Sequence, residues 1–250
     1  MSVTVCWWVM VLLQRESSSG PSAMSVFTSE TCLFTTVSVK IPAIVLTHII
    51  YRIVRDGSFA GLDKTASVKS FVGIVTEALE LLPCLLVMHP VSQMTWNKET
   101  SIDEVFHNDV ERQRELVERA LYLAENDLSD IENISRLGEG WVGEETLAIA
   151  IYSVARHIDS FEDTLVCAVN HDGDSDSTGS VAGNIIGAIV GYDAIPSKFK
   201  EHLELHDIIL AIADDLHQGC ITSEYDRNIT PEKRQWVERY CEMKPAGIDY

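Results

Sequence analysis

Apolar residues recur at helical spacing along almost the whole chain from about residue 43 onward. Side chains three and four positions apart share one face of an α-helix, whereas a half-buried strand alternates at every second position. Neither a strand–helix alternation nor an internal repeat interrupts the pattern. The sequence therefore predicts an all-α protein whose helices pack orthogonally in a single domain.

The predicted helices differ in how much of their surface should be buried. Leu147 to Tyr152 is apolar on every side, which is typical of a central helix covered all round. Pro83 predicts one helix end, Ser101 with Glu104 a capping box, and Thr230 before Pro231 another helix start. The expected helices cover residues 43–56, 66–82, a segment starting at 101, 111–126, 143–156, 161–169, 177–191, 205–217 and 231–242.

The N-terminal segment does not follow this pattern. Val3 to Leu13 is apolar for 11 residues, fewer than the roughly 20 needed to span a bilayer. A weak signal peptide, a core segment and an error in the gene prediction all remain open for it. Residues 15–40 are rich in Ser and Thr. We therefore expect an atypical segment over 1–40 and a helical domain over 41–245.

Charge excludes several classes of partner. With 38 acidic and 19 basic residues the net charge is −19, which repels nucleic acid and anionic membranes alike. Six cysteines occur without a CxxC pair, which favours reduced thiols and a cytoplasmic location. No large unpaired amphipathic stripe is visible, so a monomer is expected.

One acidic stretch, residues 171–191, carries the clearest chemical signal. Asp172, Asp174 and Asp176 alternate before the hydroxyls of Ser177 and Thr178. Such oxygen donors suit Mg²⁺ or Mn²⁺ better than Zn²⁺. A solvated acidic loop is the alternative. An EF-hand is excluded, because counting from Asp172 the required turn glycine falls on Ser177 and the twelfth-position glutamate on a glycine.

Four glycines follow at four-residue spacing and share one helix face: Gly179, Gly183, Gly187 and Gly191. Each weakens a helix by about 1 kcal/mol relative to alanine, which indicates that something approaches the backbone closely. Packing against another helix explains the last two best. For the first two, close approach of a ligand is an equal alternative.

These residues resemble a known family. Gly173 to Gly179 (GDSDSTG) is similar to the C-terminal metal motif G-D-[ST]-D-[ST]-x-G of the ADP-ribosylglycohydrolases. Leu137 to Ala150 resembles the segment that precedes this motif in the family. Asp193 to Pro196 and Ile212 to Leu216 extend the resemblance over about residues 116–220.

The resemblance implies an all-α fold with two Mg²⁺ ions, for which Mn²⁺ can substitute. It implies hydrolysis of the bond between ADP-ribose and a protein side chain or small acceptor, with arginine slightly favoured. Asp174, Asp176 and Ser177 would be metal ligands. Trp141 would line the substrate cleft, with Gly179 beside it, although a core position is the alternative for the tryptophan.

The chain also departs from the family. Its sequence contains neither the G-D-x-x-G segment nor the T-D-D-T segment that supply the other metal ligands and an acidic catalytic residue. His48 stands where a His-x-His-Pro stretch is usual, as a remnant of it or as an ordinary helix residue. No catalytic residue is therefore assigned. A truncated enzyme, an inactive relative that binds ADP-ribose or metal, and an unrelated metal-binding helical scaffold are the competing hypotheses.

Overall fold

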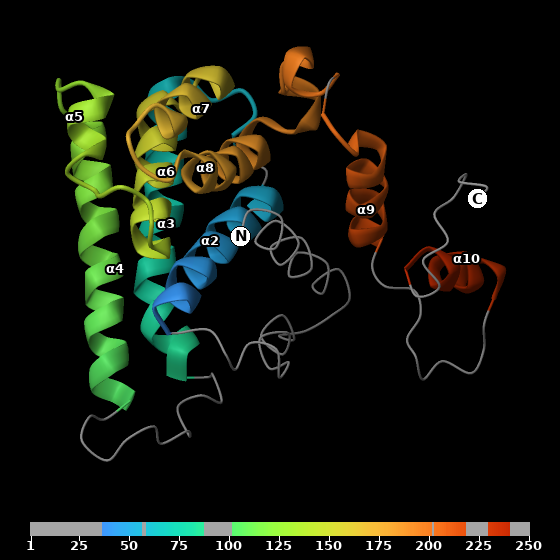
Figure 1. The fold of residues 1–250 in the computed structure, drawn as a ribbon, viewed down its shortest axis with the longest axis horizontal. Coiled ribbons are helices and arrows are strands. Elements are labelled where there is room, and N and C mark those ends of the chain that lie inside the picture. Colours follow the sequence, from blue (N-terminus) through green and yellow to red (C-terminus); the bar gives the residue numbers. More distant parts are fainter. Residues whose placement is uncertain (1–36, 57–58, 88–101, 202, 219–229, 241–250) are drawn as a thin grey trace. The chain divides into compact units, whose positions relative to one another are not determined.

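The computed structural model describes residues 37–56, 59–87, 102–201, 203–218 and 230–240 (Figure 1). Every regular element in these ranges is a helix, so the all-α prediction is confirmed there. The helices are α2 (Val37–Asp56), α3 (Lys64–Val87), α4 (Ile102–Ala124), α5 (Asp130–Ile134), α6 (Gly143–His157), α7 (Phe161–Val169), α8 (Ser175–Val190), the 3₁₀ helices η4 (Tyr192–Ala194) and η5 (Ser197–Phe199), α9 (His206–Gln218) and α10 (Pro231–Tyr240).

Elements α2 to η5 belong to one compact unit, and the chain from Glu204 onward belongs to a second. In the second unit, the hydroxyl of Thr230 accepts a hydrogen bond from the backbone N–H of Lys233 at 3.4 Å. Pro231 is the first residue of α10, which confirms the predicted start of this helix. The predicted division into residues 1–40 and 41–245 stays a prediction, because nearly all of the first segment lies outside the described residues.

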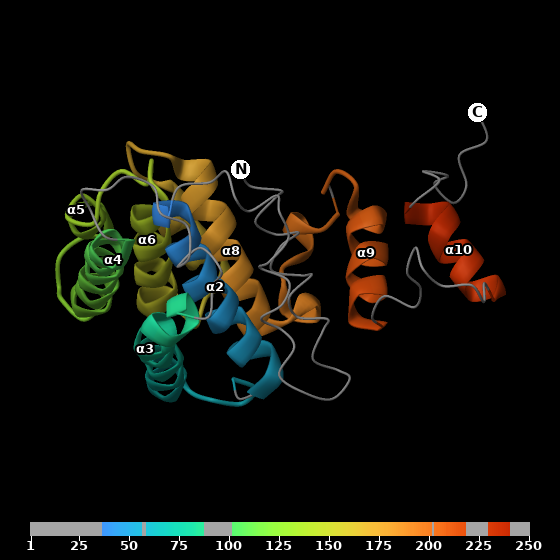
Figure 2. The same cartoon turned by 90° about the horizontal axis from the view of Figure 1, so that it is seen from below.

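Helix α6 is the centre of the first unit. Residues 146–155 are buried without interruption, which confirms the prediction from the apolar run. Helices α2, α4, α7 and α8 all contact α6, and Figure 2 shows α6 between α4 and α8. Burial on every side fixes α6, and with it the loops at its two ends.

The prediction that the second helix ends at Pro83 is wrong, because α3 continues to Val87. Proline has no backbone N–H, so the carbonyl of Leu79, four residues earlier, loses its partner within the helix. The guanidinium of Arg114 on α4 donates to that carbonyl at 3.1 Å instead. A side chain from the neighbouring helix thus satisfies the group that would otherwise favour a helix end.

The short helix α5 was not predicted. Ser129 and Glu132 form a complete capping box at its start, the pattern that the sequence showed at Ser101 and Glu104. Ser101 itself lies outside the described residues, although α4 begins at Ile102 as that pattern predicts.

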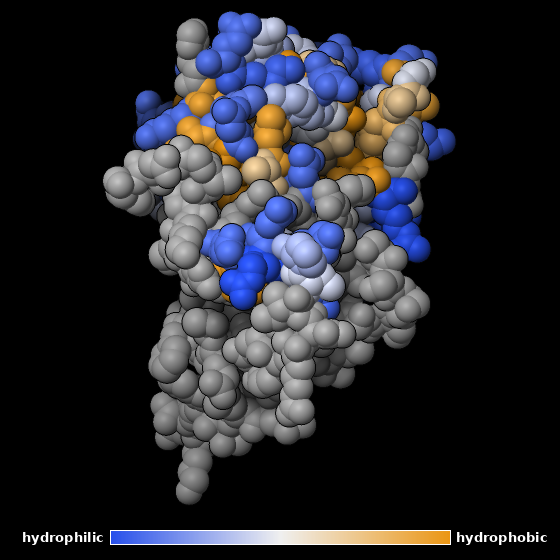
Figure 3. Space-filling model, turned by 90° about the vertical axis from the view of Figure 1, so that its right-hand side faces the viewer, coloured by the Kyte–Doolittle hydropathy of each residue, from blue (hydrophilic) through white to orange (hydrophobic). Residues whose placement is uncertain are grey.

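No helix within the described ranges is long and apolar enough to cross a lipid bilayer. On the face drawn in Figure 3, hydrophilic residues surround smaller patches of hydrophobic ones. Cys167 is buried and forms no disulfide, as expected of a reduced thiol.

Candidate functional site

The predicted metal motif forms the connection between α7 and α8 and the first turn of α8. We call residues 170–177 the acid loop. Asp174 is the N-cap of α8, and its Oδ1 accepts a hydrogen bond from the backbone N–H of Ser177 at 3.3 Å. Asp176 lies in the first turn of the same helix and is exposed. The positive end of the helix dipole favours carboxylates at this position. The three candidate ligands, Asp174, Asp176 and Ser177, therefore lie together at the start of α8.

The carboxyl groups of the acid loop interact with each other. A hydrogen bond between Asp174 and Asp176 is the main cause that lowers the pKa of Asp174, burial opposes the shift, and hydrogen bonds from Ser177 add to it. Asp174 is therefore ionised at neutral pH and offers a negatively charged oxygen to a cation.

Thr178 holds the acid loop in place through a buried hydroxyl group. It is fully buried, and its hydroxyl donates to the carbonyl of Ala168 at 2.7 Å. His171 Nε2 lies 2.9 Å from the same hydroxyl oxygen, while His171 Nδ1 accepts the backbone N–H of Gly173 at 3.1 Å. Since the hydroxyl proton is used by Ala168, the Nε2–H form of the imidazole satisfies both contacts. The loop is thus held by the last turn of α7 and by its own histidine.

The second predicted segment packs directly on the acid loop. We call residues 138–142 the Trp141 loop. The backbone N–H of Asp174 donates to the carbonyl of Glu139 at 2.8 Å. A Cβ atom at Gly173 would lie 1.8 Å from that same carbonyl oxygen, so only glycine allows the two loops to come this close. The structure therefore joins the two motifs that the sequence pointed to separately.

Glu145, at the start of α6, gives the Trp141 loop its shape. Its Oε2 accepts the backbone N–H groups of Glu139 at 3.2 Å and Gly140 at 3.1 Å. Thr146 donates to the carbonyl of Gly140 at 2.8 Å. The loop is therefore tied to the buried central helix rather than left to solvent.

A cavity of about 500 Å³ lies beside these two loops and α5. Trp141 lines it and is 66% exposed, with its indole N–H donating to Glu139 Oε2 at 3.0 Å. The alternative that Trp141 is a core residue is therefore wrong. The cavity is lined by Ile131, Ile134, Ser135, Gly138, Glu139, Trp141, Val142, Glu145, His171, Asp172 and Gly173.

The lining is acidic. Glu139, Glu145 and Asp172 contribute three carboxylates, and no Lys or Arg is among the described residues that line the cavity. A dianionic ligand would be repelled there unless a cation accompanied it. Carboxylate and hydroxyl oxygens of the acid loop are the donors that Mg²⁺ prefers, so the residues present fit such an ion.

Gly179 lies at the contact between α7 and α8. A Cβ atom there would come within 2.6 Å of Val169 Cγ1, which means that the side chain of Val169 would have to move if a larger residue replaced this glycine. Its role next to a substrate stays a prediction. Sequence reasoning did not identify Glu139 and His171 as site residues, although both lie within the stretches 137–150 and 171–191 that it singled out.

Comparison with known proteins identifies the family of the chain. The sequence model of the family described as ADP-ribosylglycohydrolase matches residues 39–226. Human ADP-ribosylhydrolase ARH3 is 29% identical over 97 residues, which is 35% of this chain and 27% of the human protein. The bovine protein of the same name is 27% identical over 106 residues, covering 38% of this chain and 29% of the bovine one.

The chain thus spans less than a third of the length of these curated relatives. No solved structure matches it at comparable significance. The family match, however, covers three quarters of the chain and includes both loops of the candidate site. This chain belongs to the ADP-ribosylglycohydrolase family.

Proposed function

We propose that the chain hydrolyses the glycosidic bond between ADP-ribose and a protein side chain or small acceptor, with Mg²⁺ as the cofactor and arginine as the favoured acceptor. The observation that carries the proposal is the docking of the Trp141 loop on the acid loop. A cavity lies beside both loops and reaches the acid loop at residues 171–173, directly before Asp174 in the sequence. The cavity volume falls within the roughly 300–1,000 Å³ of small-molecule sites.

The cavity offers an aromatic surface for the substrate. The ring of Trp141 is exposed to it and is held by Glu139 through the indole N–H. A flat ring fixed in this way can stack on a base or pack against a ribose at little cost in side-chain entropy. We therefore expect the adenosine part of ADP-ribose to pack against Trp141.

Asp174, Asp176 and Ser177 would hold Mg²⁺, which when bound supplies Lewis-acid polarisation and positions a water. The other residues keep this set in place. The capping bond to Ser177 orients Asp174, and Thr178 with His171 fixes the loop backbone. Because the cavity wall is acidic, a cation held by these residues would also reduce the repulsion between the wall and the pyrophosphate of the substrate.

A second candidate is a relative that binds ADP-ribose without turnover. The sequence itself favours it, since no G-D-x-x-G or T-D-D-T segment occurs among the 250 residues. Both candidates share the cavity and the acid loop, and they differ only in whether the bond is cleaved.

The test is release of free ADP-ribose from an ADP-ribosylated arginine peptide, with and without Mg²⁺, alongside a serine-linked peptide. We expect release only with Mg²⁺, and loss of it in Asp174→Ala and Asp176→Ala. Asp163→Ala is the matched control, because Asp163 is another exposed carboxylate in the first turn of a helix. Binding of ADP-ribose without any release would support the inactive relative instead.

A further inference from the structure

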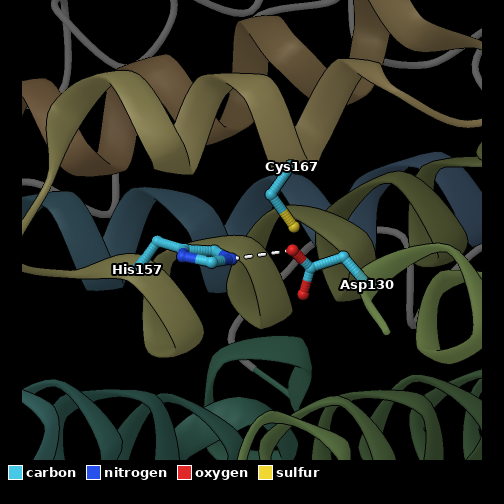
Figure 4. A group of neighbouring side chains, drawn as sticks. All are labelled: Asp130, His157 and Cys167. Carbon is cyan, nitrogen blue, oxygen red and sulfur yellow. Dashed lines mark hydrogen bonds and ion pairs between the residues drawn. The ribbon is translucent and has the colours of Figure 1, made fainter. Parts of the chain in front are cut away.

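A second group of possible metal ligands lies away from the acid loop, where α5, α6 and α7 meet (Figure 4). Asp130 is the first residue of α5, His157 is the last residue of α6, and Cys167 lies in α7. One ligand atom from each of the three lies within 4.8 Å of the others. In Figure 4 the sulfur of Cys167 points toward the Asp130 carboxylate.

The two oxygens of Asp130 have different partners. Oδ1 accepts the hydroxyl of Tyr152 at 2.6 Å and lies 3.7 Å from Arg156 Nε. Tyr152 in turn accepts a hydrogen bond from the buried Asn133 at 3.1 Å. Oδ2 faces His157 Nε2 at 2.9 Å. The first oxygen is thus held by surrounding donors, in the way that the carboxylate ligands of metal sites usually are, and the second faces His157, another of the three candidate ligands.

We propose that Asp130, His157 and Cys167 bind a Zn²⁺ ion, independently of the acid loop. Thiolate, imidazole and carboxylate are the side chains that bind zinc, at about 2.0–2.3 Å. Adjacent ligand atoms of a tetrahedral zinc then lie about 3.2–3.8 Å apart. The oxygen and the imidazole nitrogen, now 2.9 Å apart, would have to move slightly apart to reach these values. The other separations between ligand atoms are at most 4.8 Å. Water takes the fourth position.

The protons and charges balance. The S–H bond of Cys167 breaks, its proton passes to solvent, and a sulfur–zinc bond forms. The ring proton of a neutral His157 moves from Nε2 to Nδ1, so that Nε2 can bind the ion. One carboxylate and one thiolate then neutralise the two charges of zinc. Mg²⁺ does not compete, because a thiolate is a poor ligand for a hard cation.

Cobalt(II) tests the proposal on the full chain after treatment with a chelator, because a thiolate ligand gives Co²⁺ a charge-transfer band in the near ultraviolet. We expect this band to saturate at one equivalent, to vanish on addition of Zn²⁺, and to persist in excess Mg²⁺. It should be absent in Cys167→Ser and unchanged in Cys220→Ser, the matched control. Absence of the band from the wild-type chain, or its survival in Cys167→Ser, would overturn the proposal.

His157→Gln gives a second test, since it keeps the thiol and a hydrogen-bonding group for Asp130. The affinity for Co²⁺ should fall by at least about tenfold, and an unchanged affinity contradicts the site. Asp174→Ala should leave the band intact, which separates failure of this proposal from failure of the proposed function.

Discussion

The backbone N–H of Asp174 donates to the carbonyl oxygen of Glu139 at 2.8 Å, and this bond couples the acid loop to the Trp141 loop. Both partners are main-chain groups, so the bond depends on how closely the two backbones approach. That approach is set by Gly173. The geometry of the candidate site therefore depends on a residue that offers no side chain to a ligand.

Gly173→Ala should disrupt this contact. The new Cβ atom would lie 1.8 Å from the carbonyl oxygen of Glu139, so one loop must move. We expect the free energy of unfolding in urea to fall by about 1–3 kcal/mol and Mg²⁺ affinity to weaken. Gly187→Ala is the control, because, apart from its own helix backbone, no atom of the described residues lies within 4 Å of its Cβ position. It should raise stability by about 0.5–1 kcal/mol. Equal stability of the two variants would contradict the loop contact.

Trp141→Ala should weaken ligand binding while leaving the stability of the fold nearly unchanged. The side chain is largely exposed, so the free energy of unfolding should change by no more than about 0.5 kcal/mol. Loss of base stacking should weaken ADP-ribose binding by about 1–3 kcal/mol, measured by calorimetry. Trp141→Phe should keep most of the affinity. Tyr122→Ala removes another exposed aromatic ring, on α4, and should leave binding unchanged. If both alanine variants bind equally well, Trp141 does not contact the ligand.

Arg114→Ala should destabilise the helix pair α3 and α4. The guanidinium donates to the carbonyl of Leu79, which Pro83 leaves without a helical partner. We expect a loss of about 1–3 kcal/mol in urea unfolding, since the carbonyl loses its donor. The control Arg119→Ala removes an exposed guanidinium that donates to the carbonyl of Arg136 at 3.4 Å, and it should change stability by at most about 0.5 kcal/mol. Similar losses for both would refute the role given to Arg114.

His48 should make stability depend on pH. Burial of the ring is the main cause that lowers the pKa of His48; the charge of Glu77 opposes the shift and that of Arg52 adds to it. In the unfolded chain the ring protonates near its ordinary pKa of about 6.5. In the folded chain the ring stays neutral to a lower pH, because its pKa is lowered. The unfolded state therefore binds more protons, and the free energy of unfolding falls as the pH drops below about 6.5.

Urea unfolding between about pH 7.5 and about pH 5.5 measures this effect. The decline should be smaller in His48→Gln than in the wild type. His107→Gln, which alters an exposed histidine, should retain the full decline. Parallel profiles for the wild type and His48→Gln would show that another group causes the dependence.

Much of the fold could be predicted, because burial leaves a periodic trace in the sequence. The central helix α6 followed from its unbroken apolar run, and α10 from Thr230 and Pro231. The end of α3 could not be predicted, since Arg114 on another helix supplies the group that allows the helix to continue past Pro83. A five-residue helix such as α5 is too short to show a period.

The candidate site was predictable only where its residues are neighbours in sequence. Asp174, Asp176 and Ser177 share one turn, so the alternating acids, together with the resemblance to the family motif, were enough to predict a cation site there. The position of Glu139 against Asp174 depends on how two loops pack. The grouping of Asp130, His157 and Cys167 depends on three helices meeting. Single residues of these kinds carry no signal until the packing is known.

The most direct test of the central claim is calorimetric titration of ADP-ribose into the full chain, with Mg²⁺ and after its removal by a chelator. The account predicts binding that requires Mg²⁺, that is lost in Asp174→Ala, and that Asp163→Ala leaves unchanged. Binding of equal strength with and without Mg²⁺, and in all three proteins, would show that the acid loop does not hold a cation for this ligand.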